Sequence, residues 1–406
     1  MDSPHELPPE FLVLARSLSR RTFLRGGAGM AGAALLGGGA LAACSTPAKK
    51  VATSDQAATD LSATEKVVNF SNWPAYMDVD SKVATDHPTL DAFKAQTGIS
   101  VSYVEDINDN ETFYAKIQPQ LKGGQSTGRD LIVMTDWMAA RLVNANYVQK
   151  IDHANTPNLP KNILSGPLKA PAWDPNRDYS APWQSGLTGI CYNKSKTKPV
   201  TTMTDLLTRA DLKGKIAVLT EMRDTIGLIM LDSGKDPANF TDADFDNAVA
   251  VLEKAKASGQ IRAFTGNEYI QSLEKGDLVA CVAWSGDVIA MQADHPEMTW
   301  SPPEAGVMQW ADNMLIPNKA KHKKNAELLM NYYYDPKVAA ELAAFVNYIC
   351  PVEGAKAAMA AVDDTLVDNA LIFPSDADKT KFHAFKALTD NQTQTYEKKF
   401  AQVTGG

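Results

Sequence analysis

The sequence lacks the patterns that mark several common enzyme classes. Its six histidines are scattered, and no two stand at the helix or turn spacing of a zinc site. Ser185 has Trp183 two residues before it, where a nucleophile elbow has glycine. The loop from Gly123 to Gly128 has the glycine spacing of a P-loop, but Arg129-Asp130 replaces its lysine and hydroxyl residue. We therefore expect no zinc site, no serine nucleophile of this kind and no cofactor.

The chain has fewer basic than acidic residues, and this limits the kinds of partner that it is expected to bind. There are 40 Lys and Arg against 48 Asp and Glu, a formal net charge of −8. Such a balance argues against nucleic acid or an anionic membrane surface as a partner, and it favours cationic ligands. At 406 residues, 44% of them hydrophobic, the chain exceeds the usual size of one domain, so two lobes are expected.

The N-terminal segment is predicted to direct export. Residues 19–25 read Ser-Arg-Arg-Thr-Phe-Leu-Arg, a twin-arginine signature, and residues 26–43 form an uncharged run rich in Gly and Ala. The run is too short and too rich in small residues to predict a membrane span, and its basic front end is typical of a secretory signal. It ends in Leu-Ala-Ala-Cys44, which resembles the lipobox of bacterial lipoproteins. We expect residues 1–43 to be removed, Cys44 to be lipidated, and residues 44–65 to form a polar, flexible tether.

The other three cysteines, Cys191, Cys281 and Cys350, all stand in apolar surroundings. We expect them to behave as small core residues. One disulfide among them remains open, because sequence alone does not determine pairing.

The stretch from Leu278 to Asp287 is the most informative part of the chain. The apolar run Leu278–Trp284 predicts a strand buried on both faces, and Ser285-Gly286-Asp287 then begins a helix. Ligands of open α/β sheets bind at the carboxyl ends of strands, and this end carries an indole and a carboxylate. Together these groups suit a cation with an apolar stem. Taken alone, however, the pair is more often a core tryptophan and a helix-capping aspartate.

Strands that alternate with helices predict an α/β fold. Strands are expected near residues 67–70, 99–104, 130–134, 215–219, 261–264 and 278–284, and helices near 90–97, 108–121, 138–144, 226–232, 242–258 and 376–401. Gly98 is expected to end the first of these helices. Residues 155–176 are rich in proline and read as irregular, and residues 186–193 read as an extended segment that crosses between lobes.

Aromatic and acidic residues recur where the apolar runs end. The groups are Trp73 with Tyr76, Thr135 with Asp136 and Trp137, Glu221 with Asp224, Trp284 with Asp287, and Trp310 with Asp312. A single aromatic residue at such a position usually serves packing. Five such ends that meet in one crevice would form an acidic slot lined by aromatic rings.

These positions fall within a wider likeness. Over residues 66–360 the sequence resembles the polyamine-binding substrate-binding proteins of ABC importers. The matching stretches are Asn72-Trp73-x-x-Tyr76, Asn110-Glu111-Thr-x-Tyr-Ala-Lys116, Asp130-Leu-Ile-Val, Tyr179-Ser-Ala-Pro, Trp284-Ser-Gly-Asp287 and Asp312-x-x-x-Ile-Pro317. The resemblance implies a two-lobed, periplasmic-binding-protein-like fold of type II with the ligand cleft between the lobes. We expect residues 66–186 and 286–317 in the first lobe, and residues 187–285 and 318–406 in the second.

The resemblance also implies roles for individual residues. The aromatic walls would be Trp73, Tyr76, Trp137, Trp183, Trp284, Trp310 and Tyr348. The ammonium partners would be Glu221, Asp224, Asp287 and Asp312, and Thr135 would donate or accept a hydrogen bond. Pro74 and Ala75 stand where the family often has an acidic or polar residue, and Trp137 stands where it more often has Tyr. The chain length and charge of the ligand therefore stay open.

The expected function is that of a monomeric, lipid-anchored protein that binds putrescine or spermidine outside the cytoplasm and delivers it to an ABC permease. Two alternatives remain at this point. The cleft could bind another small solute, such as a sugar or an amino-acid derivative. Because paired carboxylates also serve acid–base chemistry, a secreted carbohydrate-active enzyme is the second alternative.

Overall fold

The computed structural model describes residues 56–83, 85–166 and 168–405. The expected signal segment, Cys44 and the first part of the expected tether lie outside the described residues. The strands are β1 (Val67–Asn72), β2 (Ser100–Glu105), β3 (Leu131–Thr135), β4 (Ser180–Asn193), β5 (Ile216–Leu219), β6 (Ile261–Thr265), β7 (Ala280–Trp284), β8 (Met298–Ser301), β9 (Val307–Leu315) and β10 (Phe382–His383). The α-helices are α3 (Pro88–Thr97), α4 (Asn110–Lys122), α5 (Asp136–Asn144), α6 (Asn158–Asn162), α7 (Met203–Thr208), α8 (Met222–Asp232), α9 (Asp242–Ala257), α10 (Tyr269–Glu274), α11 (Ser285–Gln292), α12 (Lys323–Tyr333), α13 (Pro336–Val346), α14 (Ala355–Met359), α15 (Asp376–Lys379) and α16 (Asp390–Thr404).

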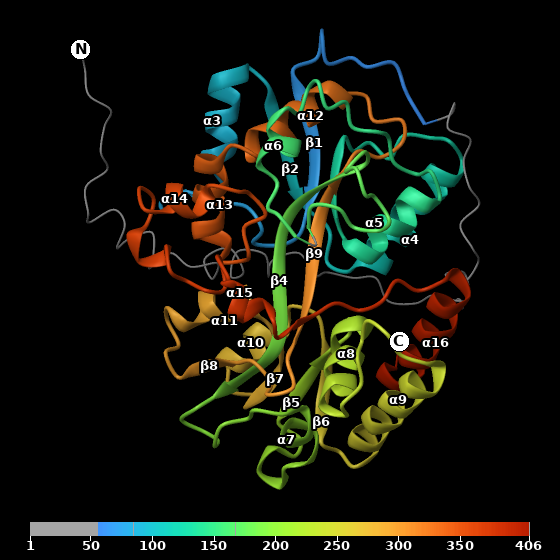
Figure 1. Ribbon diagram of the computed structural model, residues 1–406, viewed down its shortest axis with the longest axis vertical. Helices are drawn as coiled ribbons and strands as arrows, with labels where there is room; N and C mark the ends of the chain where they lie inside the picture. The colour runs from blue at the N-terminus through green and yellow to red at the C-terminus, as the bar shows by residue number, and fades with distance from the viewer. Residues whose placement is uncertain (1–55, 84, 167, 406) are drawn as a thin grey trace, which may run out of the picture.

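One sheet runs through both lobes, in the order β2-β1-β3-β9-β4-β7-β5-β6. Parallel pairs lie at its two ends, where β1 pairs with β2 and β3, and β5 pairs with β6 and β7. The long strands β4 and β9 are antiparallel and run from one lobe into the other (Figure 1). Every residue of β4 is buried, as expected of a strand covered on both faces. The two lobes are therefore joined by these two long strands of the shared sheet.

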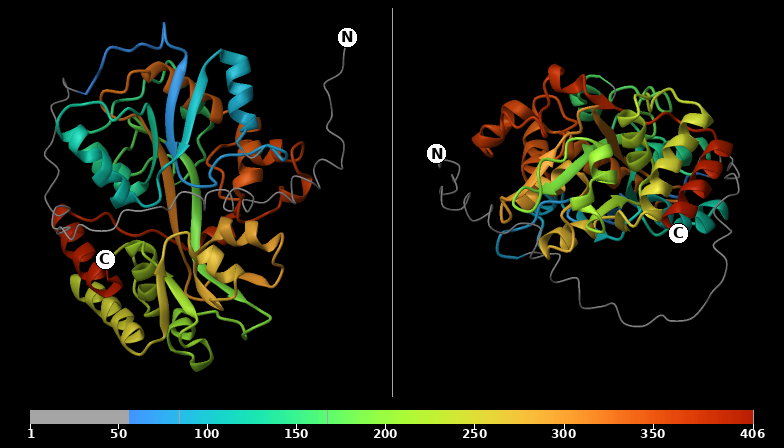
Figure 2. Two further views of the ribbon diagram at one scale, coloured as in Figure 1. Left: turned by 180° about the vertical axis from the view of Figure 1, so that it is seen from behind. Right: turned by 90° about the horizontal axis from the view of Figure 1, so that it is seen from below.

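The first lobe is a sheet covered on both faces. Alternate residues of β3 point to opposite sides, so that Leu131 and Val133 join one buried cluster and Ile132 and Met134 join another. Helices α3, α12, α13 and α14 contribute to the first cluster, and α4 and α5 contribute to the second. In the second lobe, β5 and β7 pack with α7, α8 and α9 in a single large cluster. Figure 2 shows the two lobes from behind and from below.

The late segments are distributed differently from the expected division. Helices α12, α13 and α14 bury Leu329, Ala340 and Met359 in the first lobe, although residues after 317 were assigned to the second. Conversely, Val288 of α11 and Met298 of β8 pack in the core of the second lobe. The chain thus returns to the first lobe after β9, and then crosses back to place α16 against α9 (Figure 1). The lobe whose core buries a helix therefore does not follow from the order of that helix in the chain.

The last part of the expected tether is packed against the protein. The Gln56 side-chain amide donates to the Val148 carbonyl at 2.7 Å, and the Leu61 N–H donates to the Lys321 carbonyl at 2.8 Å. Glu65 lies 2.8 Å from the His322 ring. Residues 56–65 therefore belong to the first lobe, so the tether prediction fails for them.

Several local predictions agree with the structure and others do not. Gly98 has φ of +72° and its N–H donates to the Lys94 carbonyl, which confirms it as the residue that ends α3. Helix α8 begins four residues earlier than expected, at Met222, because Glu221 serves as its N-cap. The expected helix over 376–401 is instead α15, β10 and α16, separated by irregular chain. Cys191, Cys281 and Cys350 are buried free thiols, as expected of core residues. Within the described ranges, no helix has the length and apolar character to cross a membrane.

Candidate ligand cleft

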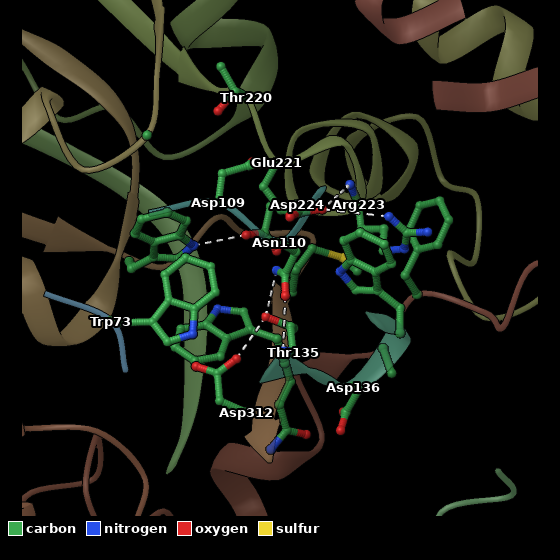
Figure 3. Close-up of a pocket in the computed structure, with 18 of the residues that line it drawn as sticks. Trp73, Asp109, Asn110, Thr135, Asp136, Thr220, Glu221, Arg223, Asp224 and Asp312 are labelled. Carbon is green, nitrogen blue, oxygen red and sulfur yellow. Dashed lines mark hydrogen bonds and ion pairs between the residues drawn. The ribbon is translucent and has the colours of Figure 1, made fainter. Parts of the chain in front are cut away.

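A cleft lies between the lobes, with about 1350 Å³ of empty space that includes its open mouth. It is lined by residues of both lobes and of the crossing strand β9. All of the predicted binding residues except Trp183 line it: Trp73, Tyr76, Thr135, Trp137, Glu221, Asp224, Trp284, Asp287, Trp310, Asp312 and Tyr348. In Figure 3, Glu221, Arg223 and Asp224 lie on one side of the cleft, and Thr135 and Asp312 lie on the other.

The convergence of strand ends explains most of this lining. Trp73 directly follows β1, Thr135 ends β3 and Trp284 ends β7, while Glu221 lies two residues beyond the end of β5. The expectation was wrong for Trp310 and Asp312, because both lie within β9 and not at its end. They reach the cleft because residues two apart on a strand point to the same face.

Asp312 is held between two hydroxyl groups of the first lobe. Thr135 Oγ1 donates to Asp312 Oδ1 at 2.7 Å, and the Tyr76 hydroxyl donates to Oδ2 at 2.9 Å. Asn110 Nδ2 in turn donates to Thr135 Oγ1 at 2.9 Å, which directs the threonine proton to the carboxylate. Burial raises the pKa of Asp312 to about 7, although both hydroxyl groups favour the charged form. A cation that enters the cleft would restore this carboxylate to its charged state.

Asp287 is held in a similar way at the other lobe. The Tyr269 hydroxyl donates to Oδ2 at 2.8 Å, and Asn267 Nδ2 donates to the same oxygen at 3.1 Å. The Tyr348 hydroxyl donates to Oδ1 at 3.2 Å and comes from the first lobe, so this contact joins the lobes. The N-cap position of α11 is occupied by Trp284, whose side chain makes no capping hydrogen bond. Asp287 thus sits in the first turn of α11, and the interpretation of its side chain as a cap is wrong.

Asp224 and Glu221 form the acidic wall of the second lobe. Trp284 Nε1 donates to Asp224 Oδ2 at 2.9 Å, which fixes both the indole and the carboxylate. Burial raises the pKa of Asp224 to about 6. Burial also raises the pKa of Glu221 well above its ordinary value, an effect that Arg223 opposes and Asp224 reinforces.

Aromatic rings line the cleft between these carboxylates. Tyr348 meets Tyr76 edge to face, with ring centroids 5.6 Å apart, and meets Trp310 at 5.3 Å. Two glycines permit this packing. A Cβ at Gly186 would lie 2.3 Å from the Trp310 ring, and one at Gly286 would lie 2.6 Å from the Tyr348 ring. A larger residue at either position would displace a wall of the cleft.

Hydrogen bonds donated by the indole N–H groups hold three of the tryptophan walls in place. Trp73 Nε1 donates to the Val133 carbonyl at 3.0 Å, Trp284 donates to Asp224, and Trp310 donates to Thr188 Oγ1 at 3.1 Å. In Trp137, Nε1 is buried and has no hydrogen-bond acceptor among the described residues. Its ring is instead covered by Arg223, whose guanidinium carbon lies 3.7 Å from the ring centroid.

Trp183 does not belong to the cleft. It is 2% exposed and packs edge to face against Phe70 and Tyr333 in the core of the first lobe. Trp183 lies on β4, which is buried throughout, so position along the chain did not indicate which face its ring would take. The prediction of Trp183 as an aromatic wall is therefore corrected.

Other residues of the cleft were not predicted as ligand-binding positions. Asn110 orients Thr135, and Arg223 covers Trp137. Tyr269 lies buried outside the lining and orients Asp287. Arg223 stands between two predicted acids in the sequence, which was the only local signal for it. Residues 384–387, in the segment that leads to α16, also line the cleft.

The chain matches a family sequence model described as bacterial extracellular solute-binding protein over residues 89–373. It is 27% identical to spermidine/putrescine-binding periplasmic protein 1 of Haemophilus influenzae over 316 residues, or 77% of this chain and 84% of the relative. It is 30% identical to the spermidine/putrescine-binding periplasmic protein of Salmonella typhimurium over 289 residues, 70% of this chain and 76% of the relative.

A solved structure has the same fold. A putative spermidine/putrescine ABC transporter protein from Listeria monocytogenes superposes with a TM-score of 0.71 at 24% identity. The superposition covers 84% of this chain and 99% of the other. The fold is thus that of two-lobed periplasmic substrate-binding proteins, with the cleft between the lobes, as the sequence predicts.

Proposed function

Since the chain belongs to the family of bacterial extracellular solute-binding proteins, we propose that it captures a polyamine in the cleft between its lobes. Putrescine or spermidine is the expected ligand, and the permease of an ABC transporter is the expected recipient. The protein acts as a monomer in this proposal, and its carboxylates bind charge and do not transfer protons to a substrate.

One observation carries the proposal: three buried carboxylates stand among aromatic rings and are oriented by neutral donors. Asp312 accepts from two hydroxyl groups, Asp287 from two hydroxyl groups and an amide, and Asp224 from an indole. An ammonium group that reaches such a carboxylate forms a charge-assisted hydrogen bond, worth about 1.5–3 kcal/mol. The rings cover a methylene chain and add cation–π attraction of about 0.5–2 kcal/mol per contact. The ligand names of the relatives agree with this chemistry.

Calorimetry tests the ligand. We expect putrescine or spermidine to bind in saturable, one-to-one fashion near pH 8, because each places ammonium groups at the ends of a methylene chain. Butane-1,4-diol is the matched control, since it has the four-carbon stem of putrescine but no charge, and it should not bind. Binding of an uncharged sugar, with no binding of putrescine, spermidine or spermine, would contradict the proposal.

We further propose that Cys44 carries a lipid that holds the protein at the outer face of the membrane. The support is the twin-arginine signature and the Leu-Ala-Ala-Cys44 stretch of the sequence. We expect Cys44→Ala to move the exported protein from the membrane fraction to the soluble fraction, because the lipid attachment atom is lost. Cys350→Ala is the control and should leave the protein in the membrane fraction. Equal membrane fractions for Cys44→Ala and the wild type would contradict the anchor.

A further inference from the structure

We propose that Trp137 and Arg223 form a latch between the lobes, and that Trp137 acts through closure of the cleft instead of serving as a wall for the ligand. The latch rests on the proposed function in one respect, because the contact is proposed to strengthen the binding of whichever amine occupies the cleft. The residues concerned belong to different lobes. Trp137 lies on α5 of the first lobe and Arg223 on α8 of the second.

The contact between them is close and anchored on both sides. The Arg223 guanidinium carbon lies 3.7 Å from the centroid of the Trp137 ring. Arg223 Nη1 donates to Glu397 of α16 at 2.9 Å and lies 3.7 Å from Glu221. Arg223 is only 7% exposed, so water screens these interactions weakly. The second lobe thus holds the guanidinium in place, and the first lobe supplies the ring that it covers.

The electrostatic surroundings argue against a ligand role for Arg223. Two carboxylates, Glu221 and Glu397, flank the guanidinium, so its charge is compensated within the second lobe. An anionic group of a ligand would meet these acids as well as the arginine. Because the guanidinium covers one face of Trp137, an ammonium group of a ligand cannot occupy that face. The structure therefore favours an internal contact that forms when the lobes meet.

Trp137 also differs from the tryptophans that serve as fixed walls. Trp73, Trp284 and Trp310 each donate an indole hydrogen bond, which fixes the ring whether or not a ligand is present. Within the described part of the chain, Trp137 Nε1 has no such acceptor. The ring also packs against the core of the first lobe, but the guanidinium that covers it comes from the second lobe, so this contact depends on closure. Tyr348 and Asp287 also join the lobes, but they do so at a carboxylate predicted to bind the ligand.

Amine binding to latch variants tests the proposal. We expect Trp137→Ala and Arg223→Met each to weaken binding of putrescine and of spermidine by the same factor, between about two- and thirty-fold, the range of one cation–π contact. The loss should appear mainly as faster dissociation in stopped-flow experiments, because the closed form lives for a shorter time. The double variant should lose no more than either single variant, since the two residues form one interaction. Trp137→Phe keeps an aromatic ring and Arg223→Lys keeps a cation, so each variant should retain part of the affinity that the alanine and methionine variants lose.

Arg141 provides a matched control. Its guanidinium carbon lies 4.3 Å from the Tyr114 ring centroid and its Nη1 donates to Glu111 at 2.7 Å, but all three residues lie in the first lobe. Arg141→Met removes a cation–π contact of the same kind within one lobe, so amine affinity should change much less than in either latch variant. A spermidine-to-putrescine affinity ratio that shifts more than about threefold in Trp137→Ala would show direct contact with the ligand and overturn the latch.

Small-angle scattering supplies a readout that does not depend on the ligand. We expect ligand-free Trp137→Ala and Arg223→Met to have a larger radius of gyration than the wild type, because the lobes separate more often. If the wild type binds no amine, the proposed function fails, and these radii alone decide the latch. Radii equal to that of the wild type in both variants would then overturn it.

Discussion

Asp287→Asn is expected to weaken putrescine binding by about ten- to two-hundred-fold, which corresponds to the 1.5–3 kcal/mol of a hydrogen bond to a charged group. The substitution keeps the shape of the side chain but removes its charge. It also places an amide NH₂ among the hydroxyl groups of Tyr269 and Tyr348 and the amide of Asn267, all of which now donate to the carboxylate. Calorimetry at pH 8 measures the loss.

Two further substitutions separate this effect from others. Thr135→Ala removes one neutral donor but leaves the charge of Asp312 in place, so the loss of amine binding should be smaller, about two- to tenfold or 0.5–1.5 kcal/mol. Asp91→Asn is the matched control, because Asp91 lies in the first turn of α3 as Asp287 does in α11, but it does not line the cleft. It should change binding little. If Asp287→Asn and Thr135→Ala cause equal losses, Asp287 does not act as a charge partner.

The parts of the site that follow from local pattern were predictable from sequence. A strand followed by a helix places its last residues at the edge of a sheet where ligands bind, which made Trp284 and Asp287 candidates for the cleft. The same chemistry at other strand ends and the family resemblance then assigned them to it. Trp310 and Asp312 were assigned correctly to the cleft but for a partly wrong reason, since alternation within β9 directs them there. For a short strand or helix, the sequence pattern predicts on which side of the element a residue lies.

The parts that depend on distant packing were not predictable. Arg223 and Glu397 are 174 positions apart, and nothing near either residue indicates that they meet. The return of α12 to the first lobe likewise leaves no local mark, because an apolar helix face fits either core. Trp183 shows the same limit for a strand buried on both faces. In each case the local sequence does not indicate which distant part of the protein the side chain or helix contacts.

The cleft also predicts a strong dependence of binding on pH. Burial raises the pKa of Asp312 to about 7 and that of Asp224 to about 6, so both carboxyls are largely protonated at pH 5 and ionised at pH 8. The ammonium groups of an alkyl polyamine titrate near pH 10, as lysine does, and stay charged over this range. A bound ammonium favours the charged carboxylate, so each protonated carboxyl must release its proton on binding. Affinity should therefore rise with pH and level off above pH 8.

The size of the effect follows from linkage. Below its pKa, each carboxyl that must ionise lowers the apparent affinity tenfold per pH unit. Between pH 8 and pH 5 this amounts to about a hundredfold for Asp312 and about tenfold for Asp224, or about a thousandfold if both contact the ligand. Calorimetry at pH 6.5 in two buffers with different ionisation enthalpies should detect the released protons.

Asp312→Asn distinguishes the two carboxyls. The variant should bind more weakly at pH 8, and its affinity should change with pH less than that of the wild type, because one of the carboxyls that release a proton on binding is gone. Thr188→Val, which removes the hydroxyl that favours ionised Asp224, should steepen the dependence near pH 6. An affinity that stays constant from pH 8 to pH 5, or rises toward low pH, would mean that these carboxylates do not hold the ammonium groups. The cation would then have to be held elsewhere in the cleft, and the hydroxyls of Tyr76 and Thr135 would only orient Asp312 within the protein.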